Sequence, residues 1–143
     1  LMELHPQEHR ALRQALPGAE IHKRDGYEGV LALSPAGQTR GLVLVDPSYE
    51  VKAEYRRAAE FVSALAAKWP GATVLVWYPL LKAGGEKELL AHLRPLGARI
   101  DEVRLCGSKL RMLGSGLALV NPPHGSGRLI AKGLRIATRF ADL

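Results

Sequence analysis

The sequence predicts an α/β fold with a doubly wound, mostly parallel sheet and one late antiparallel strand. Short apolar runs alternate with longer segments of helical periodicity through most of the 143 residues, as is typical of strands joined by helices. Near the end this alternation breaks, because the predicted strands Ile100–Leu105 and Leu117–Val120 follow each other with no crossover helix between them. Such neighbours most easily pair antiparallel.

The elements before the central strand are short. The chain opens as though inside a strand, at Leu1-Met2-Glu3, and Pro6 stands at a favoured first-turn position of a helix. Apolar residues recur at helical spacing up to Leu16, and Pro17-Gly18 ends that helix. We then predict a strand at Ala19–Lys23, a turn at Asp25-Gly26 and a short helix at Tyr27–Leu33.

The central strand is Gly41–Val45. Its valine-rich apolar run, bounded by a glycine and a proline, predicts a strand buried on both faces of a parallel sheet. Asp46, Pro47 and Tyr49 follow directly at its carboxyl end. Ligands of open α/β sheets bind beyond the carboxyl ends of the strands, so Asp46 is placed to point into a cleft. Pro47 stiffens the turn that holds it.

The second half of the chain repeats the alternation. Apolar residues at helical spacing predict an amphipathic helix at Glu50–Trp69, which Pro70-Gly71 stops. We further predict, in order, a buried strand at Thr73–Trp77 ended by Tyr78-Pro79, a helix at Lys87–Leu96 closed by Gly97, the two late strands, and a helix at Arg128–Phe140.

Composition is that of an ordinary globular domain. Apolar residues make up 47% of the chain and charged residues 24%, with no run of membrane-spanning length and no signal-peptide pattern. The single Cys106 excludes an internal disulfide and suits a reducing cytoplasm, which is the predicted location. A net charge of +6 suits an anionic partner such as nucleic acid, although composition alone slightly favours a charge that only keeps the protein in solution.

Three carboxylates lie at or near the ends of successive predicted strands: Glu3, Asp25 and Asp46. Because those ends share one edge of a parallel sheet, we expect all three to face a single crevice. An acid after an early strand accepts hydrogen bonds from ribose hydroxyls, and an Asp25-Gly26 turn meets an adenine edge. Asp46 then meets the group being modified. The alternative is that these acids only occupy turns and helix starts, which they favour anyway.

The segment Asp46-Pro47-Ser48-Tyr49 resembles the (Asn/Asp)-Pro-Pro-(Tyr/Phe/Trp) motif of S-adenosylmethionine-dependent methyltransferases that modify exocyclic amines. A longer resemblance runs in order through most of the chain, to the RlmJ family of bacterial 23S ribosomal RNA adenine-N6 methyltransferases, a family also associated with use of external DNA. The segments that carry it are Glu3-Leu4-His5-Pro6, Asp25-Gly26-Tyr27, the run from Arg40 to Glu50, Trp77-Tyr78-Pro79, and Gly114-Ser115-Gly116-Leu117 leading to Asn121-Pro122-Pro123.

The resemblance implies a class I, Rossmann-like methyltransferase sheet with S-adenosylmethionine as cofactor and ribosomal RNA as partner. It implies that the cofactor contacts are Glu3, Asp25, Gly26 and Asp46. Asp46 is also the implied catalytic acid, and together with the carbonyl of Pro47 it would accept the two hydrogens of adenine N6. Tyr49 would stack on the extruded base.

Residues beyond the motif are candidates for holding the RNA. Lys52, Arg56 and Arg57 follow Tyr49 closely and are placed for substrate phosphate, and Tyr78 is a candidate wall of the base pocket. A basic stripe in the last predicted helix is either a solvated face or a phosphate-contacting ridge; its members are Arg128, Lys132, Arg135 and Arg139. His5 and His9 stand at metal-binding spacing, but no third ligand is evident and no metal site is predicted.

The chain departs from the family in two ways. Ser48 replaces the second proline of the motif, and the family's amino-terminal half, with the first strand of the sheet, has no counterpart. We therefore expect residues 1–143 to be the carboxyl-terminal portion of one methyltransferase domain, weak or inactive alone, with exposed strand edges that favour self-association. Two alternatives stay open: a non-catalytic nucleic-acid-binding module, and a methyltransferase for DNA or protein amines.

Overall fold

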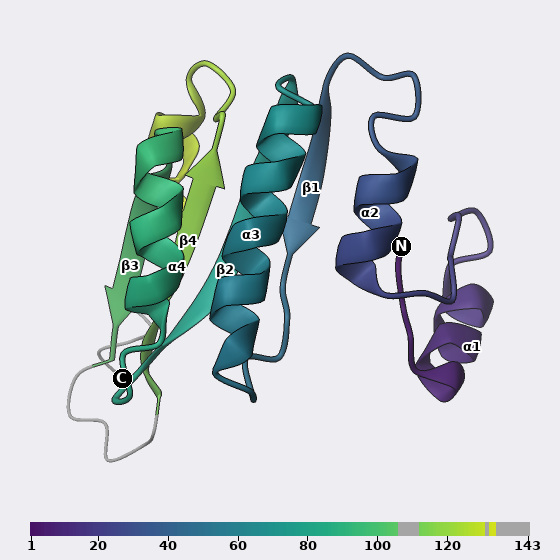
Figure 1. Ribbon diagram of the computed structural model, residues 1–143, viewed down its shortest axis with the longest axis horizontal. Coiled ribbons are helices and arrows are strands. Elements are labelled where there is room, and N and C mark those ends of the chain that lie inside the picture. The colour runs from purple at the N-terminus through teal and green to yellow at the C-terminus, as the bar shows by residue number, and fades with distance from the viewer. Residues whose placement is uncertain (106–111, 131, 134–143) are drawn as a thin grey trace. The chain divides into compact units, whose positions relative to one another are not determined.

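The larger part of the chain is built on a four-stranded sheet. Its strands, in spatial order, are β1 (Gly41–Val45), β2 (Ala72–Leu81), β4 (Met112–Val120) and β3 (Arg99–Arg104) (Figure 1). This computed structural model describes residues 1–105, 112–130 and 132–133. The chain divides into two units, Leu1–Gly37 and Gln38–Leu143, and the sheet belongs entirely to the second.

Strand direction confirms the predicted late antiparallel strand. β1 pairs parallel with β2, whereas β4 pairs antiparallel with both β2 and β3. Three strands therefore run one way and β4 runs the other way between two of them. The carboxyl ends of β1, β2 and β3 lie at one edge of the sheet as a result, and the carboxyl end of β4 lies at the opposite edge.

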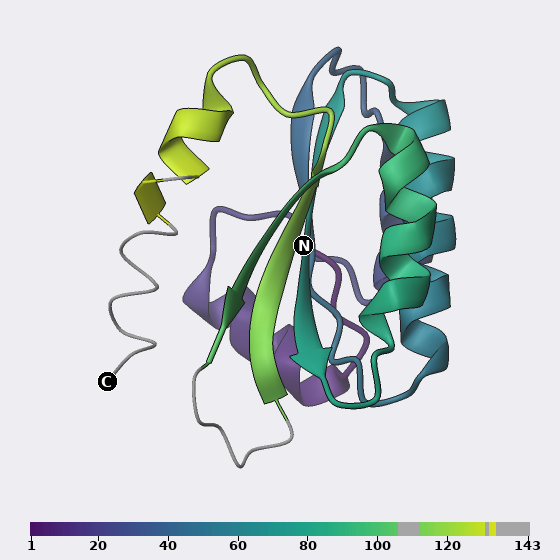
Figure 2. The same ribbon diagram turned by 90° about the vertical axis from the view of Figure 1, so that its left-hand side faces the viewer.

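Two helices, α3 (Ala53–Lys68) and α4 (Glu86–Leu93), lie side by side on one face of this sheet (Figure 2). α3 turns apolar residues toward the strands at helical spacing; those buried include Tyr55, Ala58, Ala59, Val62 and Leu65. A 3₁₀ turn, η1 (Arg94–Leu96), follows α4 and ends at Gly97, whose φ of 72° is the left-handed conformation that glycine adopts without strain. The predicted helices at Glu50–Trp69 and Lys87–Leu96 are confirmed with shorter bounds.

The prediction that the central strand is buried on both faces is wrong. Val43 and Val45 are buried beneath the helices, but Leu42 and Leu44 are 68% and 63% exposed. The cause is position: β1 is the outermost strand, and α3 and α4 cover only the other face. The strand bounds themselves are confirmed.

β2 is longer than predicted. The pattern placed its end at Tyr78-Pro79, whereas the strand continues through Pro79 to Leu81. β1 stops at Val45, opposite Val76, so the rest of β2 has a strand neighbour only in β4. A proline is tolerated where one side of a strand is unpaired, because its missing N–H costs no ladder bond there.

Residues 1–37 contain the helices α1 (Pro6–Ala15) and α2 (Gly26–Leu33), both close to their predicted bounds. The predicted strand at Ala19–Lys23 is wrong: only an isolated parallel bridge between Met2 and His22 forms, with hydrogen bonds from His22 N to Leu1 O and from Glu3 N to His22 O. A single partner residue on each side supports a bridge and no ladder.

The predicted last helix, Arg128–Phe140, falls largely outside the described residues. Within them, residues 126–130 and 132–133 are helical, and residues 126–130 lie on the side of the sheet away from α3 and α4 (Figure 2). Among the described residues, no helix has the length and apolar character needed to cross a membrane.

Candidate functional site

The candidate site lies at the carboxyl ends of β1 and β2. Asp46 is the first residue after β1 and is exposed, while Val45 beside it is buried in the core. The alternation of the strand, together with Pro47 as the next residue, carries the chain from the core to the surface at this point. The structure thus places the predicted acid at the sheet edge where ligands of such folds bind.

Tyr49 is buried, and this differs from its expected role as a stacking surface. Its ring is 4% exposed, its hydroxyl donates to the carbonyl oxygen of Trp77 at 2.9 Å, and its ring centroid lies 4.5 Å from that of Tyr55. Burial first, and then the charges of Tyr55 and Asp46, raise the pKa of Tyr49. Tyr49 therefore fastens the loop that carries Asp46 onto β2.

The backbone at Tyr49 is strained. Its φ of 52° lies in the left-handed region, which is unfavourable for a bulky side chain and costs on the order of 1–3 kcal/mol. The hydrogen bond to Trp77 and the contact with Tyr55 hold it there. Strain of this kind gathers at functional loops, because it fixes a geometry that a relaxed turn does not adopt.

A pocket of about 240 Å³ opens beside Tyr49. Its walls come from the connection after β1 and the connection after β2; they are Tyr49, Glu50, Lys52, Tyr55, Leu81, Ala83 and Gly85. The pocket therefore lies at the same edge of the sheet as Asp46, although Asp46 and Pro47 do not line it.

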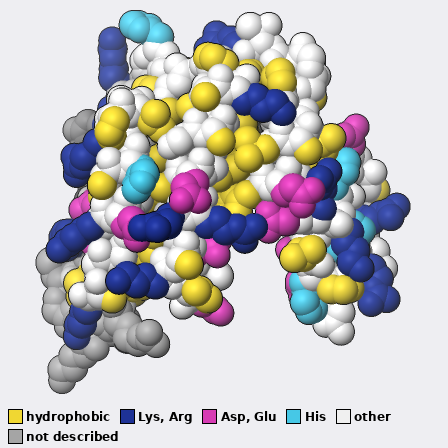
Figure 3. Space-filling view, viewed as in Figure 1, with side chains coloured by type: hydrophobic (Ala, Val, Ile, Leu, Met, Phe, Trp, Pro, Cys, Tyr) yellow, Lys and Arg dark blue, Asp and Glu magenta, His cyan; other side chains and the backbone are white. Residues whose placement is uncertain are grey.

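The predicted phosphate ligands divide between two environments. Lys52 is exposed at the pocket. Arg56 instead donates to the Glu88 carboxylate of α4 at 2.8 Å, and this bond raises the pKa of Arg56. Arg57 is exposed and also has an interaction partner. Figure 3 shows basic and acidic side chains side by side over α3 and α4, so this helix face is mixed in charge.

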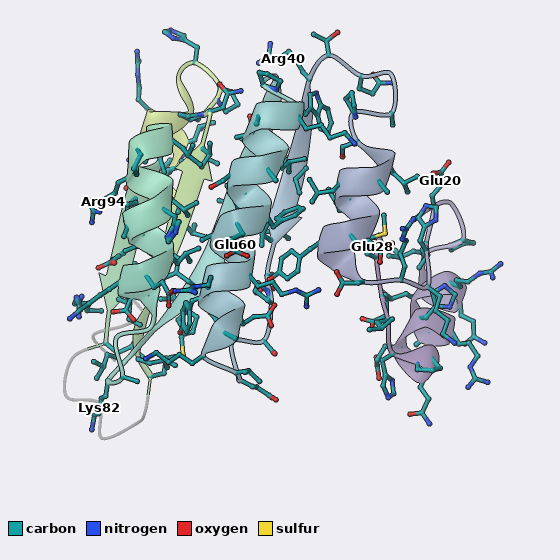
Figure 4. All side chains as sticks on the ribbon, in the orientation of Figure 1. Glu20, Glu28, Arg40, Glu60, Lys82 and Arg94 are labelled. Atoms are coloured by element: carbon teal, nitrogen blue, oxygen red, sulfur yellow. The ribbon has the colours of Figure 1, made fainter. Side chains whose placement is uncertain are left out.

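Two basic residues escaped the sequence analysis: Lys82 and Lys87, in and just after the connection from β2 to α4. Both are exposed, and Figure 4 shows Lys82 pointing away from the sheet beyond the carboxyl end of β2. The signal that could have found them is their place directly after a buried strand, where the analysis looked only for acids and aromatic residues.

Tyr78, the candidate wall of a base pocket, is fully buried. Its hydroxyl donates to Glu102 Oε1 at 3.2 Å, and its ring packs over Gly116 of β4. Burial, followed by the Glu102 charge, raises the pKa of Tyr78. This position favours a role in the core, while Trp77, its neighbour on the other face, is only half-buried.

Glu3 and Asp25-Gly26 come together within residues 1–37. The segments that follow Met2 and His22 run in the same direction, because the bridge between these two residues is parallel. Gly26 also lies near Met2, since a Cβ on Gly26 would stand 4.0 Å from the Met2 Cβ. The Glu3 carboxylate accepts from His5 N at 2.6 Å. Asp25 caps α2, its Oδ1 accepting from Tyr27 N and Glu28 N at 3.1 Å each.

Asn121-Pro122-Pro123, the other segment with an amide and two prolines, lies at the opposite edge of the sheet from Asp46. The Asn121 side chain donates to Pro70 O at 2.9 Å and to Ala72 O at 3.0 Å. Because β4 runs antiparallel, its carboxyl end meets the beginning of β2. Asn121 therefore ties two strands together and is far along the sheet from the candidate site.

Comparison with protein families gives one match across most of the chain. The family model described as "Ribosomal RNA large subunit methyltransferase D, RlmJ" matches residues 1–134. The chain belongs to this family. The RlmJ proteins are ribosomal RNA methyltransferases, so the chain is part of an enzyme family that methylates RNA.

Two curated RlmJ relatives match the chain. Ribosomal RNA large subunit methyltransferase J of Escherichia coli K12 is 30% identical over 131 residues, and the protein of the same name from Haemophilus influenzae is 29% identical over 131 residues. Each match covers 86% of this chain and 47% of the relative. The chain therefore spans about half the length of these RlmJ proteins.

Two solved structures are similar to this chain. A crystal structure of a protein from Legionella pneumophila superposes with a TM-score of 0.82 at 29% identity, over 96% of this chain and 54% of that one. Precorrin 8w decarboxylase from Methanobacterium thermoautotrophicum superposes with a TM-score of 0.56 at 19% identity, over 85% of this chain and 68% of that one. The second likeness concerns the fold alone.

Proposed function

We propose that this chain is the carboxyl-terminal portion of an S-adenosylmethionine-dependent enzyme that methylates adenine N6 in 23S ribosomal RNA, in the cytoplasm. The observation that carries the proposal is Asp46, an exposed acid at the carboxyl end of a parallel strand, on a loop fastened by the buried Tyr49, in a member of the RlmJ family. Because the chain spans about half of its relatives, we assign full activity to the protein at their length and little to this chain alone.

The residues near the beginning of the chain fit the adenosine part of the cofactor. One Glu3 oxygen accepts from His5, which leaves the other for a ribose hydroxyl. Gly26 begins α2, where backbone N–H groups have no acceptor within the helix and suit an adenine ring nitrogen. Asp25 contributes by holding this turn through its cap. The cofactor, when bound, supplies an electrophilic methyl group on its sulfonium.

The chemistry assigned to the chain itself is activation and positioning of the amine. Adenine N6 is a poor nucleophile, because its lone pair is delocalised into the ring. Asp46 Oδ and the Pro47 carbonyl accept the two amine hydrogens, which favours a pyramidal nitrogen whose lone pair points at the methyl group. Tyr49 acts by fixing the loop, since its ring is buried and its hydroxyl is engaged with Trp77.

We also propose that the sheet continues beyond β1. β1 is the edge strand of the described sheet, and its outward leucines, Leu42 and Leu44, are exposed. An edge strand with exposed apolar side chains on its uncovered face is normally paired at its free edge or covered. A strand from the other half of an RlmJ-length protein fits this position, as the first strand of the class I methyltransferase sheet.

The decisive experiment is Asp46→Ala in a protein extended to the length of its relatives. Removing the side-chain acceptor should lower transfer of labelled methyl to 23S ribosomal RNA by about a hundredfold or more, the cost of losing one preorganised electrostatic partner. Glu60→Gln, an exposed acid on α3, is the matched control and should keep full activity. Calorimetry with S-adenosylhomocysteine should show little change in affinity. Retained turnover in Asp46→Ala would remove Asp46 from the mechanism.

The same assay decides between the proposal and its alternatives. Transfer of labelled methyl to DNA or protein extract, with none to RNA, would favour a different amine substrate. RNA binding without cofactor binding in the extended protein would favour a non-catalytic module.

A further inference from the structure

We infer that the pocket beside Tyr49 is a second nucleotide site, which holds an RNA nucleotide adjacent to the adenosine being methylated. The inference rests on the proposed function, since it takes RNA as the substrate. The pocket, of about 240 Å³, lies at the catalytic edge of the sheet and belongs wholly to Gln38–Leu143.

The pocket is distinct from the place where the reacting amine must stand. Asp46 and Pro47 supply the amine acceptors, and neither lines the pocket. The buried Tyr49, three residues beyond Asp46, forms one of its walls. A base inside the pocket therefore has Tyr49 beside it and its amine away from Asp46, while the next nucleotide along the strand is in reach of the acid.

Tyr55, in the pocket wall, carries a polar atom that the protein leaves without a partner, and Glu86, the residue after the lining residue Gly85, carries another. The Tyr55 hydroxyl and Glu86 Oε2 are the buried side-chain atoms without a hydrogen bond in the described part of the chain. Tyr55 is 3% exposed and Glu86 8% exposed, and the Glu86 charge, after burial, raises the pKa of Tyr55. Buried polar atoms are nearly always paired, so an unpartnered hydroxyl in the pocket wall, with an unpartnered carboxylate oxygen on the residue after Gly85, favours a ligand that completes them.

The chemistry of this pair matches the edge of a nucleobase. A tyrosine hydroxyl donates a hydrogen bond, and a carboxylate oxygen accepts one. Base edges present an acceptor nitrogen or carbonyl next to an N–H, so one base supplies both missing partners. The ring of Tyr55 adds a flat surface, and base–aromatic stacking contributes about 1–3 kcal/mol per base.

Lysine side chains around the opening of the pocket provide positive charge for the phosphate of the nucleotide. Lys52 lines the pocket, Lys82 lies between two of its lining residues, Leu81 and Ala83, and the Lys87 side chain lies over Gly84, where a Cβ would meet its Cε at 3.4 Å. Lys82 points outward at this edge (Figure 4). Arg56, by contrast, is already neutralised by Glu88. Lysines above an aromatic, hydrogen-bonding wall suit a nucleotide better than a neutral ligand.

The test uses the 143-residue chain with two probes, a fluorescein-labelled single-stranded RNA hexanucleotide followed by anisotropy and adenosine 5′-monophosphate followed by amide chemical shifts. The variants are Tyr55→Phe, Lys82→Gln and Lys87→Gln. Lys68→Gln, at the far end of α3, is the matched charge control. Thermal unfolding of each variant separates binding from folding.

We expect Tyr55→Phe to fold as stably as the parent and to bind the hexanucleotide about three- to tenfold more weakly, the range expected of one hydrogen bond. Lys82→Gln and Lys87→Gln should each reduce the slope of log affinity against log salt by about 0.7, the value for one phosphate contact on a single strand. Lys68→Gln should leave both unchanged. The monophosphate should shift the amides of Ala83 and Gly85.

The site is overturned by a lack of binding of either probe to the parent chain, or by equal binding to the parent and Tyr55→Phe. Weakening by Lys68→Gln as large as that by Lys82→Gln would show general charge attraction and would overturn it as well. In the extended enzyme, full methyl transfer by Tyr55→Phe would contradict the second nucleotide site and leave the proposed function unaffected. A lack of methyl transfer to RNA, together with binding that depends on Tyr55, would contradict the proposed function and leave the nucleotide site unaffected.

Discussion

At the scale of single residues, three buried tyrosines differ in the hydrogen bonding of their hydroxyl groups. The Tyr49 hydroxyl donates to a backbone carbonyl, the Tyr78 hydroxyl donates to Glu102, and the Tyr55 hydroxyl has no partner. All three are nearly or fully buried. The sequence distinguishes none of these states, because each depends on which atoms other elements bring to the ring.

Phenylalanine substitution should separate two of these tyrosines in unfolding experiments. Tyr78→Phe removes the hydrogen bond from the buried Tyr78 hydroxyl to Glu102 Oε1 and should lower the free energy of unfolding by about 1–2 kcal/mol. Tyr55→Phe removes an unpaired buried hydroxyl, so stability should stay equal or rise slightly. Urea unfolding followed by circular dichroism measures both. A larger loss in Tyr55→Phe than in Tyr78→Phe would mean that the Tyr55 hydroxyl has a partner in solution.

At the scale of elements, local pattern predicted the four helices α1 to α4 and the bounds of β1, because each carries its own signals, such as helical spacing of apolar residues, Pro17-Gly18 and Gly97. The pattern failed where an element depends on its neighbours. Pro79 read as a strand end, yet β2 continues because only one side of it is paired there. Ala19–Lys23 read as a strand, yet it forms only the isolated bridge between His22 and Met2 among the described residues. Whether a segment forms a strand depends on the strands that pair with it, and the local sequence does not show which strands those are.

The packing of β2 against β4 gives a prediction at this scale. A Cβ on Gly116 would stand 2.2 Å from the Tyr78 ring, which is fully buried and cannot move aside. Gly116→Ala should therefore destabilise the protein by about 1–3 kcal/mol, the usual cost of overpacking. Gly18→Ala is the control, because a Cβ there meets nothing within 4 Å and its backbone is not left-handed. Equal melting temperatures for the two variants would contradict the tight contact between Tyr78 and Gly116.

At the scale of the whole molecule, the two ends of the parallel strands differ: the candidate site lies at their carboxyl ends, and a contact that joins two strands lies at the opposite edge. Asp46, Lys52 and Lys82 lie at the carboxyl ends of the parallel strands, whereas Asn121 joins β4 to the start of β2 at the other edge. The sequence alone predicted which acid follows a buried strand, because strand ends leave a readable pattern. It did not predict that Tyr49 and Tyr78 turn inward, since that depends on a left-handed residue and on the sheet register.

The open edge of β1 predicts association between copies of this chain. β1 is the outermost strand of the described sheet and carries the exposed Leu42 and Leu44, which favours pairing with another strand. Sedimentation velocity should show a weight-average mass that rises with concentration, and Leu44→Lys should reduce this rise. Val51→Lys, which changes an equally exposed apolar residue in a connection, should not. A monomer at every concentration would argue against a strand-pairing edge, and so would equal effects of the two lysines.

The hydrogen bond between the Tyr49 hydroxyl and the Trp77 carbonyl links the fluorescence of Trp77 to the position of the Asp46 loop. The two rings are 6.3 Å apart, so any ligand that shifts the Asp46 loop alters the surroundings of the Trp77 indole. The second indole, Trp69, is anchored at the opposite edge through its donation to Thr39 O and sits too far away to respond. Intrinsic fluorescence, with Trp69→Phe to leave one emitter, is thus a label-free reporter of events at the acid.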